Sequence, residues 1–225
     1  MTSALAHGDL FGQGPRQVTT YPNGLVHVPG YLSLDAQRAL LIEIETALLE
    51  APLFQPAMPK TGKAFSVRMS NCGDLGWVSD RDGGYRYQAT HPLTRRPWPK
   101  IPVAALEAWE RLAHYPFPPE ACLVNYYDAQ ARMGLHQDSD EADMQAPVLS
   151  LSLGASCIFR FGGTQRGGKT IGLELASGDA LVLAGESRLA YHGVARILPG
   201  TSPLSSRILA DGRINLTLRR VTRPA

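Results

Sequence analysis

The feature that most constrains this fold is a series of short apolar runs in the second half of the chain. Six of them read CLVNYY, VLSLSL, CIFRF, IGLEL, DALVLAG and RINLTLRR, with turn residues such as paired glycines between them. Strands at such short intervals favour an antiparallel sandwich or jelly roll over units that alternate strands with helices. The second half of the chain is therefore predicted to form a β-sandwich.

Two helices are predicted ahead of this sandwich. Residues 33–50 place apolar side chains on one helical stripe, and Ser33 is a candidate cap for the first turn. Residues 103–114 repeat the pattern more weakly after a proline-rich approach. The stretch between them, residues 56–100, shows no sustained periodicity, so we expect loops and short hairpins there.

The length of the chain favours one domain. With 225 residues it can bury one substantial core, but not two comfortable ones. We expect an α+β fold that is mainly β. In it, residues 1–55 form an N-terminal extension and helix, residues 56–100 form a lid, and residues 101–225 form a helix and the sandwich core.

Composition argues against several classes of protein. No segment approaches the roughly 20 apolar residues that span a bilayer, and the first dozen residues lack the basic and apolar regions of a secretory signal. The three cysteines form no CxxC pair, which indicates neither a disulfide framework nor a thiolate zinc site. We predict a cytoplasmic protein without membrane contact whose cysteines are reduced and mostly buried.

His136 and Asp138 form a His-x-Asp motif that could bind a metal. Residues two apart on a strand face the same side, so the imidazole and the carboxylate could reach one ion. His192 follows 54 residues after Asp138, and a jelly roll can return it beside the pair. Two imidazoles and one carboxylate suit non-haem Fe(II). The alternatives are that His192 is an ordinary core histidine and that His-x-Asp is a chance match, as we take it to be at His7.

The run from Arg213 to Arg219 alternates between apolar and polar side chains. With a period of two, Ile214, Leu216 and Leu218 face one side, and Arg213, Asn215, Thr217 and Arg219 face the other. Guanidinium groups pair bidentately with carboxylates, so this polar face could bind a dicarboxylate. Asn125 and Tyr127 offer an amide and a phenol at the same spacing. Beside iron ligands, such a face indicates 2-oxoglutarate; the alternative is an edge strand with a solvated polar face.

Long segments of the sequence closely resemble the AlkB-type Fe(II)/2-oxoglutarate dioxygenases, which are oxidative demethylases of alkylated nucleic-acid bases. The segments are MSNCGDLGWVSDRDGGYRYQATHPLTRRPWP, LVNYYDAQARMGLHQDSDEADMQAPVLSLSLG, IFRFGG, GDALVLAGESRLAYHG and RINLTLRR. The resemblance covers residues 66–221 and implies a double-stranded β-helix, which is a jelly roll, with a nucleotide-recognition lid. It implies Fe(2+) ligands at His136, Asp138 and His192, and 2-oxoglutarate contacts at Asn125, Tyr127, Arg213, Asn215 and Arg219. It also implies contacts to the substrate base at Trp77, Tyr85, Tyr87, Asp140 and Arg166.

The resemblance also implies an activity. The expected reaction couples decarboxylation of 2-oxoglutarate by O₂ to demethylation of 1-methyladenine and 3-methylcytosine, with release of formaldehyde. The expected substrate is alkylated single-stranded DNA, with double-stranded DNA or RNA as further possibilities, and we expect the protein to act as a monomer. Two departures from the family pattern leave the fine substrate preference open. The loop before Tyr85 is one residue longer, and the turn at Arg166 lacks a basic neighbour.

The lid aromatics also have a rationale in composition. Residues 60–100 hold eight Lys and Arg against three Asp, and residues 166–225 hold nine basic against four acidic residues. Aromatic side chains among cations suit single-stranded or flipped-out nucleotides, which need stacking faces and phosphate neutralisation. The alternatives are solvated surface charge and an aromatic cluster that only supports an irregular segment. Two other functions stay open: an RNA or protein hydroxylase or demethylase on the same scaffold, and a non-catalytic nucleic-acid-binding module.

Overall fold

The protein is a two-sheet sandwich, which the computed structural model describes for residues 17–224. The larger sheet contains, in spatial order, β1 (Thr19–Thr20), β2 (Val26–Val28), β11 (Ala180–Leu183), β8 (Val148–Gly154), β13 (Arg213–Arg219), β6 (Ala121–Tyr127) and β3 (Arg68–Gly73). The smaller sheet contains β10 (Thr170–Leu175), β9 (Ser156–Gly162), β12 (His192–Leu198) and β7 (Met133–His136). Neighbouring strands are antiparallel in both sheets, which confirms the mainly β jelly-roll prediction.

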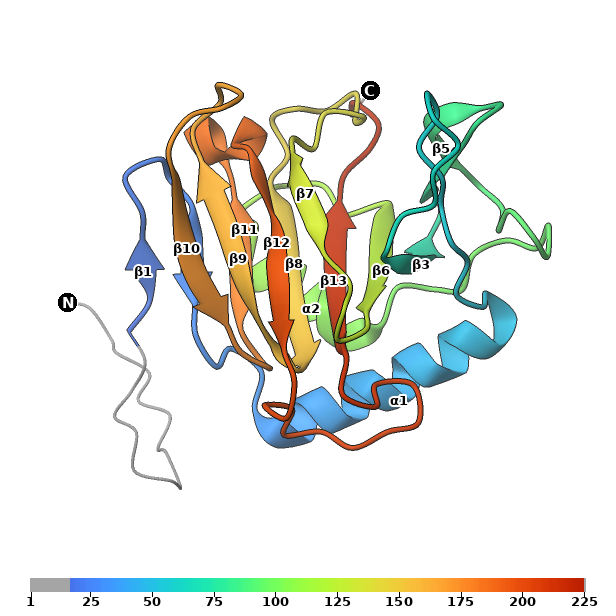
Figure 1. The fold of residues 1–225 in the computed structure, drawn as a ribbon, viewed down its shortest axis with the longest axis horizontal. Coiled ribbons are helices and arrows are strands. Elements are labelled where there is room, and N and C mark those ends of the chain that lie inside the picture. Colours follow the sequence, from blue (N-terminus) through green and yellow to red (C-terminus); the bar gives the residue numbers. More distant parts are fainter. Residues whose placement is uncertain (1–16, 225) are drawn as a thin grey trace.

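Two helices cover the outer face of the larger sheet. Helix α1 (Leu34–Glu50) begins after Ser33, whose side chain accepts a hydrogen bond from the Ala36 amide, and α2 (Val103–Leu112) follows the proline-rich approach. Apolar side chains of both helices share one buried cluster with the outward residues of β6, β8 and β13. Figure 1 shows α1 along the bottom of the view and α2 behind the strands. Both helix predictions are confirmed to within two residues.

The inner face of the larger sheet turns toward the smaller sheet. On β13, Ile214, Leu216 and Leu218 are fully buried in the cluster under the helices, so the polar residues between them face the interior of the sandwich. A second cluster fills the space between the sheets with side chains such as Phe159, Phe161 and Leu181. The alternating pattern of β13 therefore separates two environments, a dry helix-covered face and a polar interior face.

The segment expected to form an irregular lid contains three strands. Its first strand, β3, pairs with β6 at the edge of the larger sheet, so this part belongs to the sandwich. Strands β4 (Gly76–Asp80) and β5 (Gly84–Gln88) form a separate hairpin, which stands at the right of Figure 1. Its tight turn needs Gly84 at a φ of 68°, a conformation that side chains disfavour. Of the segment expected to form the lid, this hairpin and its flanking loops thus lie outside the two sheets of the sandwich.

Two further findings refine the sequence predictions. Strand β7 ends at His136, so Asp138 lies in the following loop rather than two residues along one strand, and the strand does not continue to Asp140. Residues 137–142 belong to no strand, so sheet hydrogen bonds do not constrain their path. The three cysteines are free and buried, as predicted. Within residues 17–224, neither helix has the length and apolar character needed to cross a membrane.

Candidate active site

A cavity of about 720 Å³ opens between the two sheets beneath the hairpin. Its lining includes twelve of the thirteen site residues expected from the sequence: Trp77, Tyr85, Asn125, Tyr127, His136, Asp138, Asp140, Arg166, His192, Arg213, Asn215 and Arg219. Tyr87 does not line the cavity. The fold thus gathers residues from the hairpin, both sheets and two loops around one space.

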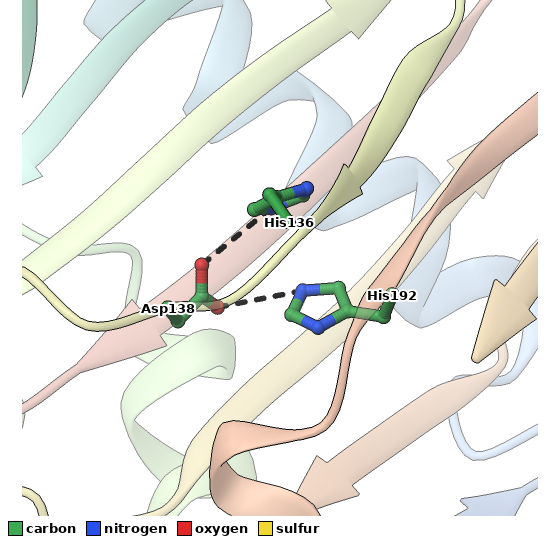
Figure 2. Close-up of side chains that lie close together, drawn as sticks. All are labelled: His136, Asp138 and His192. Atoms are coloured by element: carbon green, nitrogen blue, oxygen red, sulfur yellow. Dashed lines mark ion pairs between the residues drawn. The ribbon is translucent and has the colours of Figure 1, made fainter. Parts of the chain in front are cut away.

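Three potential metal ligands meet at the edge of the smaller sheet. His136 at the end of β7 pairs in register with His192 at the start of β12. A Cβ added to Gly193 would lie 2.5 Å from the Met133 carbonyl oxygen, so the glycine allows this close approach of the strands. Asp138 lies beside both rings, with its Oδ1 3.6 Å from the Nε2 of His136 and its Oδ2 3.6 Å from the Nε2 of His192 (Figure 2). The candidate ligand atoms all lie within 4.8 Å of one another.

Backbone contacts determine which imidazole nitrogen of each histidine faces this centre. The Nδ1 of His136 lies 2.9 Å from the Gly134 carbonyl oxygen, and the Nδ1 of His192 lies 2.9 Å from the Ala190 carbonyl oxygen. A carbonyl only accepts hydrogen bonds, so each Nδ1 carries the proton and each Nε2 keeps its lone pair. Two lone pairs and a carboxylate therefore converge, an arrangement that a metal cation would stabilise.

The charges around the centre favour the forms that bind metals. Burial lowers the pKa of His192 to about 4, so its ring is neutral near pH 7. Burial alone would raise the pKa of Asp138, but the positive charge of Arg219, aided by the two histidines and Arg188, holds it well below its usual value. One oxygen of this carboxylate, Oδ2, is buried without a hydrogen-bond partner. A buried, unpaired carboxylate oxygen is unfavourable unless a cation satisfies it.

Arg213 lies at the closed end of the cavity, where it has no acidic partner. Its side chain is 1% exposed and donates to the Ser152 hydroxyl at 2.6 Å and to two backbone carbonyls at 3.2 and 3.4 Å. Its Nε has no partner, and no ion pair to it is found within residues 17–224. A buried guanidinium without a counter-ion is costly, so this end is suited to an incoming carboxylate.

Arg219 lies at the opposite end of β13 and already has acidic partners. Its guanidinium contacts the Asp138 carboxylate at 2.7 Å and the Glu141 carboxylate at 2.7 Å. Arg188 forms a second buried ion pair with Glu141 at 2.9 Å. Ion pairs therefore connect Asp138 and Arg219, which line this end of the cavity, to the buried Glu141 and Arg188 behind them.

Amides and hydroxyls line the floor between the two arginines. Asn125 on β6 donates to the Thr217 hydroxyl at 3.3 Å, and that hydroxyl donates to the Asn215 oxygen at 2.9 Å. Asn215 in turn donates to the Ser150 hydroxyl at 2.6 Å. Tyr127, opposite Arg213 in the sheet register, contributes a phenol. Burial raises the pKa of Tyr127, so this phenol stays protonated and can donate a hydrogen bond.

Aromatic side chains form the mouth of the cavity. Trp77 on β4 and Tyr85 on β5 stack with ring centroids 5.6 Å apart, and the Trp77 indole donates to the Asp140 carboxylate at 2.7 Å. Tyr85 is 51% exposed, whereas Trp77 is 9% exposed. Arg166 reaches the same mouth from the loop between β9 and β10. Tyr87 lies opposite Trp77 in the hairpin register, so it shares the face that carries Trp77 and Tyr85, and its hydroxyl contacts Glu141 and Arg219.

Comparison with known proteins identifies the family to which this chain belongs. The family model of the 2OG-Fe(II) oxygenase superfamily matches residues 24–219. The chain belongs to this superfamily. Within it, the chain belongs to the AlkB family, because it is 52% identical over 192 residues to an alpha-ketoglutarate-dependent dioxygenase AlkB homolog of Caulobacter vibrioides, with 85% of each chain covered.

Other AlkB proteins agree with this assignment. The AlkB dioxygenase of Escherichia coli is 41% identical over 192 residues, which cover 84% of this chain and 86% of that protein. The solved structure of OsALKBH1 superposes with a TM-score of 0.74 at 28% identity and covers 91% of this chain and all of that one. The resemblance inferred from the sequence is confirmed, and the chain is an Fe(II)- and 2-oxoglutarate-dependent dioxygenase.

The residues present fit both groups that an AlkB-family dioxygenase uses. The Nε2 atoms of the two histidines and the Oδ2 of Asp138, which has no hydrogen-bond partner, fit Fe(II), which accepts mixed imidazole and carboxylate ligands. The guanidinium of Arg213, which has no acidic partner among the described residues and whose Nε has no hydrogen-bond partner, fits one carboxylate of 2-oxoglutarate. Two of the buried atoms without a hydrogen-bond partner, Oδ2 of Asp138 and Nε of Arg213, thus match the charges of these two groups.

Two buried residues of this AlkB-family site were not anticipated from the sequence. Glu141 lies in the same acidic run as Asp138, so its position offered a signal that it would lie close by. Arg188 gave no signal, because it is separated from Glu141 by 47 residues and sits on a short 3₁₀ helix, η1 (Gly185–Leu189). The second His-x-Asp motif, at His7, lies outside the described residues.

Proposed function

We propose that this protein oxidatively demethylates N-alkylated bases, such as 1-methyladenine and 3-methylcytosine, in DNA and also in RNA. The observation that carries the proposal is a single cavity with three distinct parts. A ligand set for a metal lies in one wall, a buried unpaired arginine lies at the closed end, and stacked aromatic rings lie at the mouth. The printed names of the bacterial relatives, which are AlkB dioxygenases, support the same reaction class.

The residues have distinct roles in this proposal. His136, Asp138 and His192 hold Fe(II), and Asn125, Tyr127, Arg213, Asn215 and Arg219 hold 2-oxoglutarate. When bound, the two groups activate O₂ and supply the oxidant for the N-methyl carbon, with succinate, CO₂ and formaldehyde as products. The protein contributes orientation: the backbone carbonyls fix both imidazole rings, and the two sheets exclude bulk water from the space between them.

The mouth is proposed to recognise the base. Tyr85 and Trp77 offer a stacking surface, and stacking is worth about 1–3 kcal/mol per base. Asp140 shares one oxygen with the Trp77 indole, which leaves the other free to accept a hydrogen bond from an exocyclic amino group of adenine or cytosine. The exposed Arg166 adds positive charge at the same mouth. A methylated base flipped out of its stack would fit this combination.

The proposal also covers the oligomeric state of the protein, its location and the form of its nucleic-acid substrate. We propose that it acts as a monomeric single domain in the cytoplasm and that single-stranded nucleic acid is its preferred substrate. The position of the metal ligands inside a cavity supports the last point, because an unpaired base costs less to place in a cavity than one extracted from a duplex.

The decisive experiment separates base recognition from the iron chemistry. Tyr85→Ala should reduce demethylation of a methylated single-stranded oligonucleotide by about tenfold, because one stacking surface is lost. Release of succinate without nucleic acid should continue at close to the parent rate, because Tyr85 does not contact the ligand set. Formaldehyde, succinate and the mass of the oligonucleotide would be measured together.

Phe117→Ala provides a matched control. Phe117 is also a partly exposed aromatic residue next to a tyrosine, with tilted rings 6.0 Å apart, but it does not line the cavity. This variant should leave demethylation unchanged. If Tyr85→Ala retained full demethylation, or if neither methylated DNA nor methylated RNA were a substrate, the proposed base specificity would be wrong and a protein substrate would be the next to test.

A further inference from the structure

The Glu141 carboxylate lies at the centre of a buried cluster beside the proposed metal site. Its side chain is inaccessible to solvent, and its two oxygens contact Arg219 at 2.7 Å and Arg188 at 2.9 Å. Arg219 also contacts the second carboxylate, Asp138. We refer to Tyr87, Asp138, Glu141, Arg188 and Arg219 as the Glu141 cluster. Its two positive and two negative charges balance, which buried charges require.

Arg188 fixes the loop that carries the metal ligand Asp138. Its Nη1 donates to the backbone carbonyl of Asp138 at 2.6 Å, and its Nε donates to the carbonyl of Ala146 at 2.8 Å. One side chain, 3% exposed, therefore holds both ends of the loop and the Glu141 carboxylate in its middle. Because Asp138 lies beyond the end of β7, no sheet hydrogen bonds perform this task.

Tyr87 connects the same cluster to the lid hairpin. Its hydroxyl donates to Glu141 and accepts from Arg219 at 3.2 Å. The other strand of the hairpin is joined to the loop through the hydrogen bond from Trp77 to Asp140. Both strands of the hairpin at the mouth of the cavity are thus joined to the loop of residues 137–142, which contains Asp138, Asp140 and Glu141. The hydroxyl of Tyr87 thus already has two partners, Glu141 and Arg219.

We propose that Glu141 and Tyr87 are positioning residues, which hold Arg219 and the Asp138 carboxylate in place for metal and 2-oxoglutarate and fasten the base-binding hairpin to them. This inference rests on the proposed function for the identity of the substrate, but not for the binding of metal and co-substrate. It assigns Tyr87 a role distinct from base contact. It also predicts that disrupting the Glu141 cluster weakens both the binding of metal and co-substrate and the recognition of the base.

Two variants test the proposal. Tyr87→Phe removes only the hydroxyl, and Glu141→Gln keeps the shape of the side chain but removes its charge. Loss of one hydrogen bond to Arg219 should raise the KM for 2-oxoglutarate by about fivefold in Tyr87→Phe, and the loss of charge should raise it by about tenfold or more in Glu141→Gln. Affinity for Mn(II), measured by titration of the metal-free protein, should fall in Glu141→Gln. The ratio of formaldehyde to succinate should fall in both variants.

Tyr115→Phe is the matched control. Tyr115 also donates through its hydroxyl to a buried carboxylate of the same loop, Asp143, at 2.6 Å, but it contacts neither Arg219 nor the cavity. It should lower the melting temperature about as much as Tyr87→Phe and leave the KM, the Mn(II) affinity and the product ratio unchanged. A purely structural role of the cluster would make the two tyrosine variants behave alike.

The outcomes distinguish this proposal from the proposed function. Unchanged KM for 2-oxoglutarate and unchanged Mn(II) affinity in both Tyr87→Phe and Glu141→Gln would overturn the positioning role. The same effects in Tyr115→Phe would overturn it as well. If the parent protein released succinate but no formaldehyde from any methylated oligonucleotide, the proposed substrate would be wrong, and the KM and Mn(II) comparisons would still decide the role of the cluster.

Discussion

The two ends of strand β13 present the same side chain to the same cavity in opposite electrostatic states. Arg213 is buried among neutral oxygens and has no acidic partner within the described residues. Arg219, six residues along the strand, contacts two carboxylates. The same alternation of side chains along β13 turns both arginines inward. They differ in their acidic partners only because different segments of the chain pack against each one.

This difference indicates what each arginine can do. A buried cation without a partner lowers its free energy when an anion arrives, so the Arg213 end is built to bind one. The charge of Arg219 is already neutralised, so its main effect is to hold two acidic groups in place, one of which is a proposed metal ligand. The Arg213 end is therefore suited to bind an anion, and the Arg219 end is suited to hold the proposed metal ligand Asp138 in place.

The largest effect should come from removing a ligand at the metal end. His136→Ala should abolish metal binding and reduce demethylation to background, while the fold persists because the His136 side chain is 40% exposed and supports no core packing. Metal titration, product assays and circular dichroism would test this. His7→Ala removes the histidine of the other His-x-Asp motif and should have no effect; equal behaviour of the two variants would refute the metal assignment.

The next effect concerns stability, for which the two ends should differ. Arg219→Met leaves Asp138 and Glu141 buried with fewer cations, so it should lower the free energy of unfolding of the metal-free protein by about 3–5 kcal/mol. Arg213→Met removes an unpaired buried charge, so it should change that free energy by only about 1 kcal/mol, in either direction. Denaturant unfolding of both variants would measure the contrast, and equal losses would contradict it.

A conservative change should separate the ends by affinity. Arg213→Lys should raise the KM for 2-oxoglutarate by about ten- to a hundredfold, since an ammonium cannot replace a planar two-pronged contact and one charge-assisted hydrogen bond is worth about 1.5–3 kcal/mol. Arg219→Lys should also raise the KM but by less, because its charge is shared with two carboxylates. Steady-state kinetics at varied 2-oxoglutarate concentration would rank the two, and the reverse order would exchange their roles.

The smallest expected effect is on the pH dependence of stability. Burial would raise the pKa of Glu141, but Arg219, the Tyr87 hydroxyl and Arg188 together lower it below its usual value. A lowered pKa stabilises the fold above the unfolded-state pKa of about 4.3, and this contribution is lost as pH falls through the folded-state value. The parent and Arg213→Met should therefore lose stability in parallel below about pH 4.3, and Arg219→Met should lose less. Urea unfolding between pH 3 and 7 would show whether the curves diverge.

Much of this protein could be predicted from local pattern. The helix over residues 34–50, the six principal strands and the inward face of β13 follow from apolar spacing, because periodicities of 3.6 and two residues decide which side chains can be buried together. The family also followed from the sequence, since its motifs are contiguous. The ligand candidates were predicted from residue type, and the fold brings all three together.

The tertiary structure alone decided how those residues are used. It placed Asp138 in a loop beyond β7, brought β3 into the larger sheet, and joined the Tyr87 hydroxyl to Glu141 and Arg219. It also paired Arg219 with acids and left Arg213 without one, through contacts between residues 47 to 81 positions apart. Such contacts depend on strand register and on the path of loops, and a local pattern of polar and apolar residues contains neither. The sequence by itself therefore determined which groups face the interior, and only the packing of distant segments determined which charges remain available for ligands.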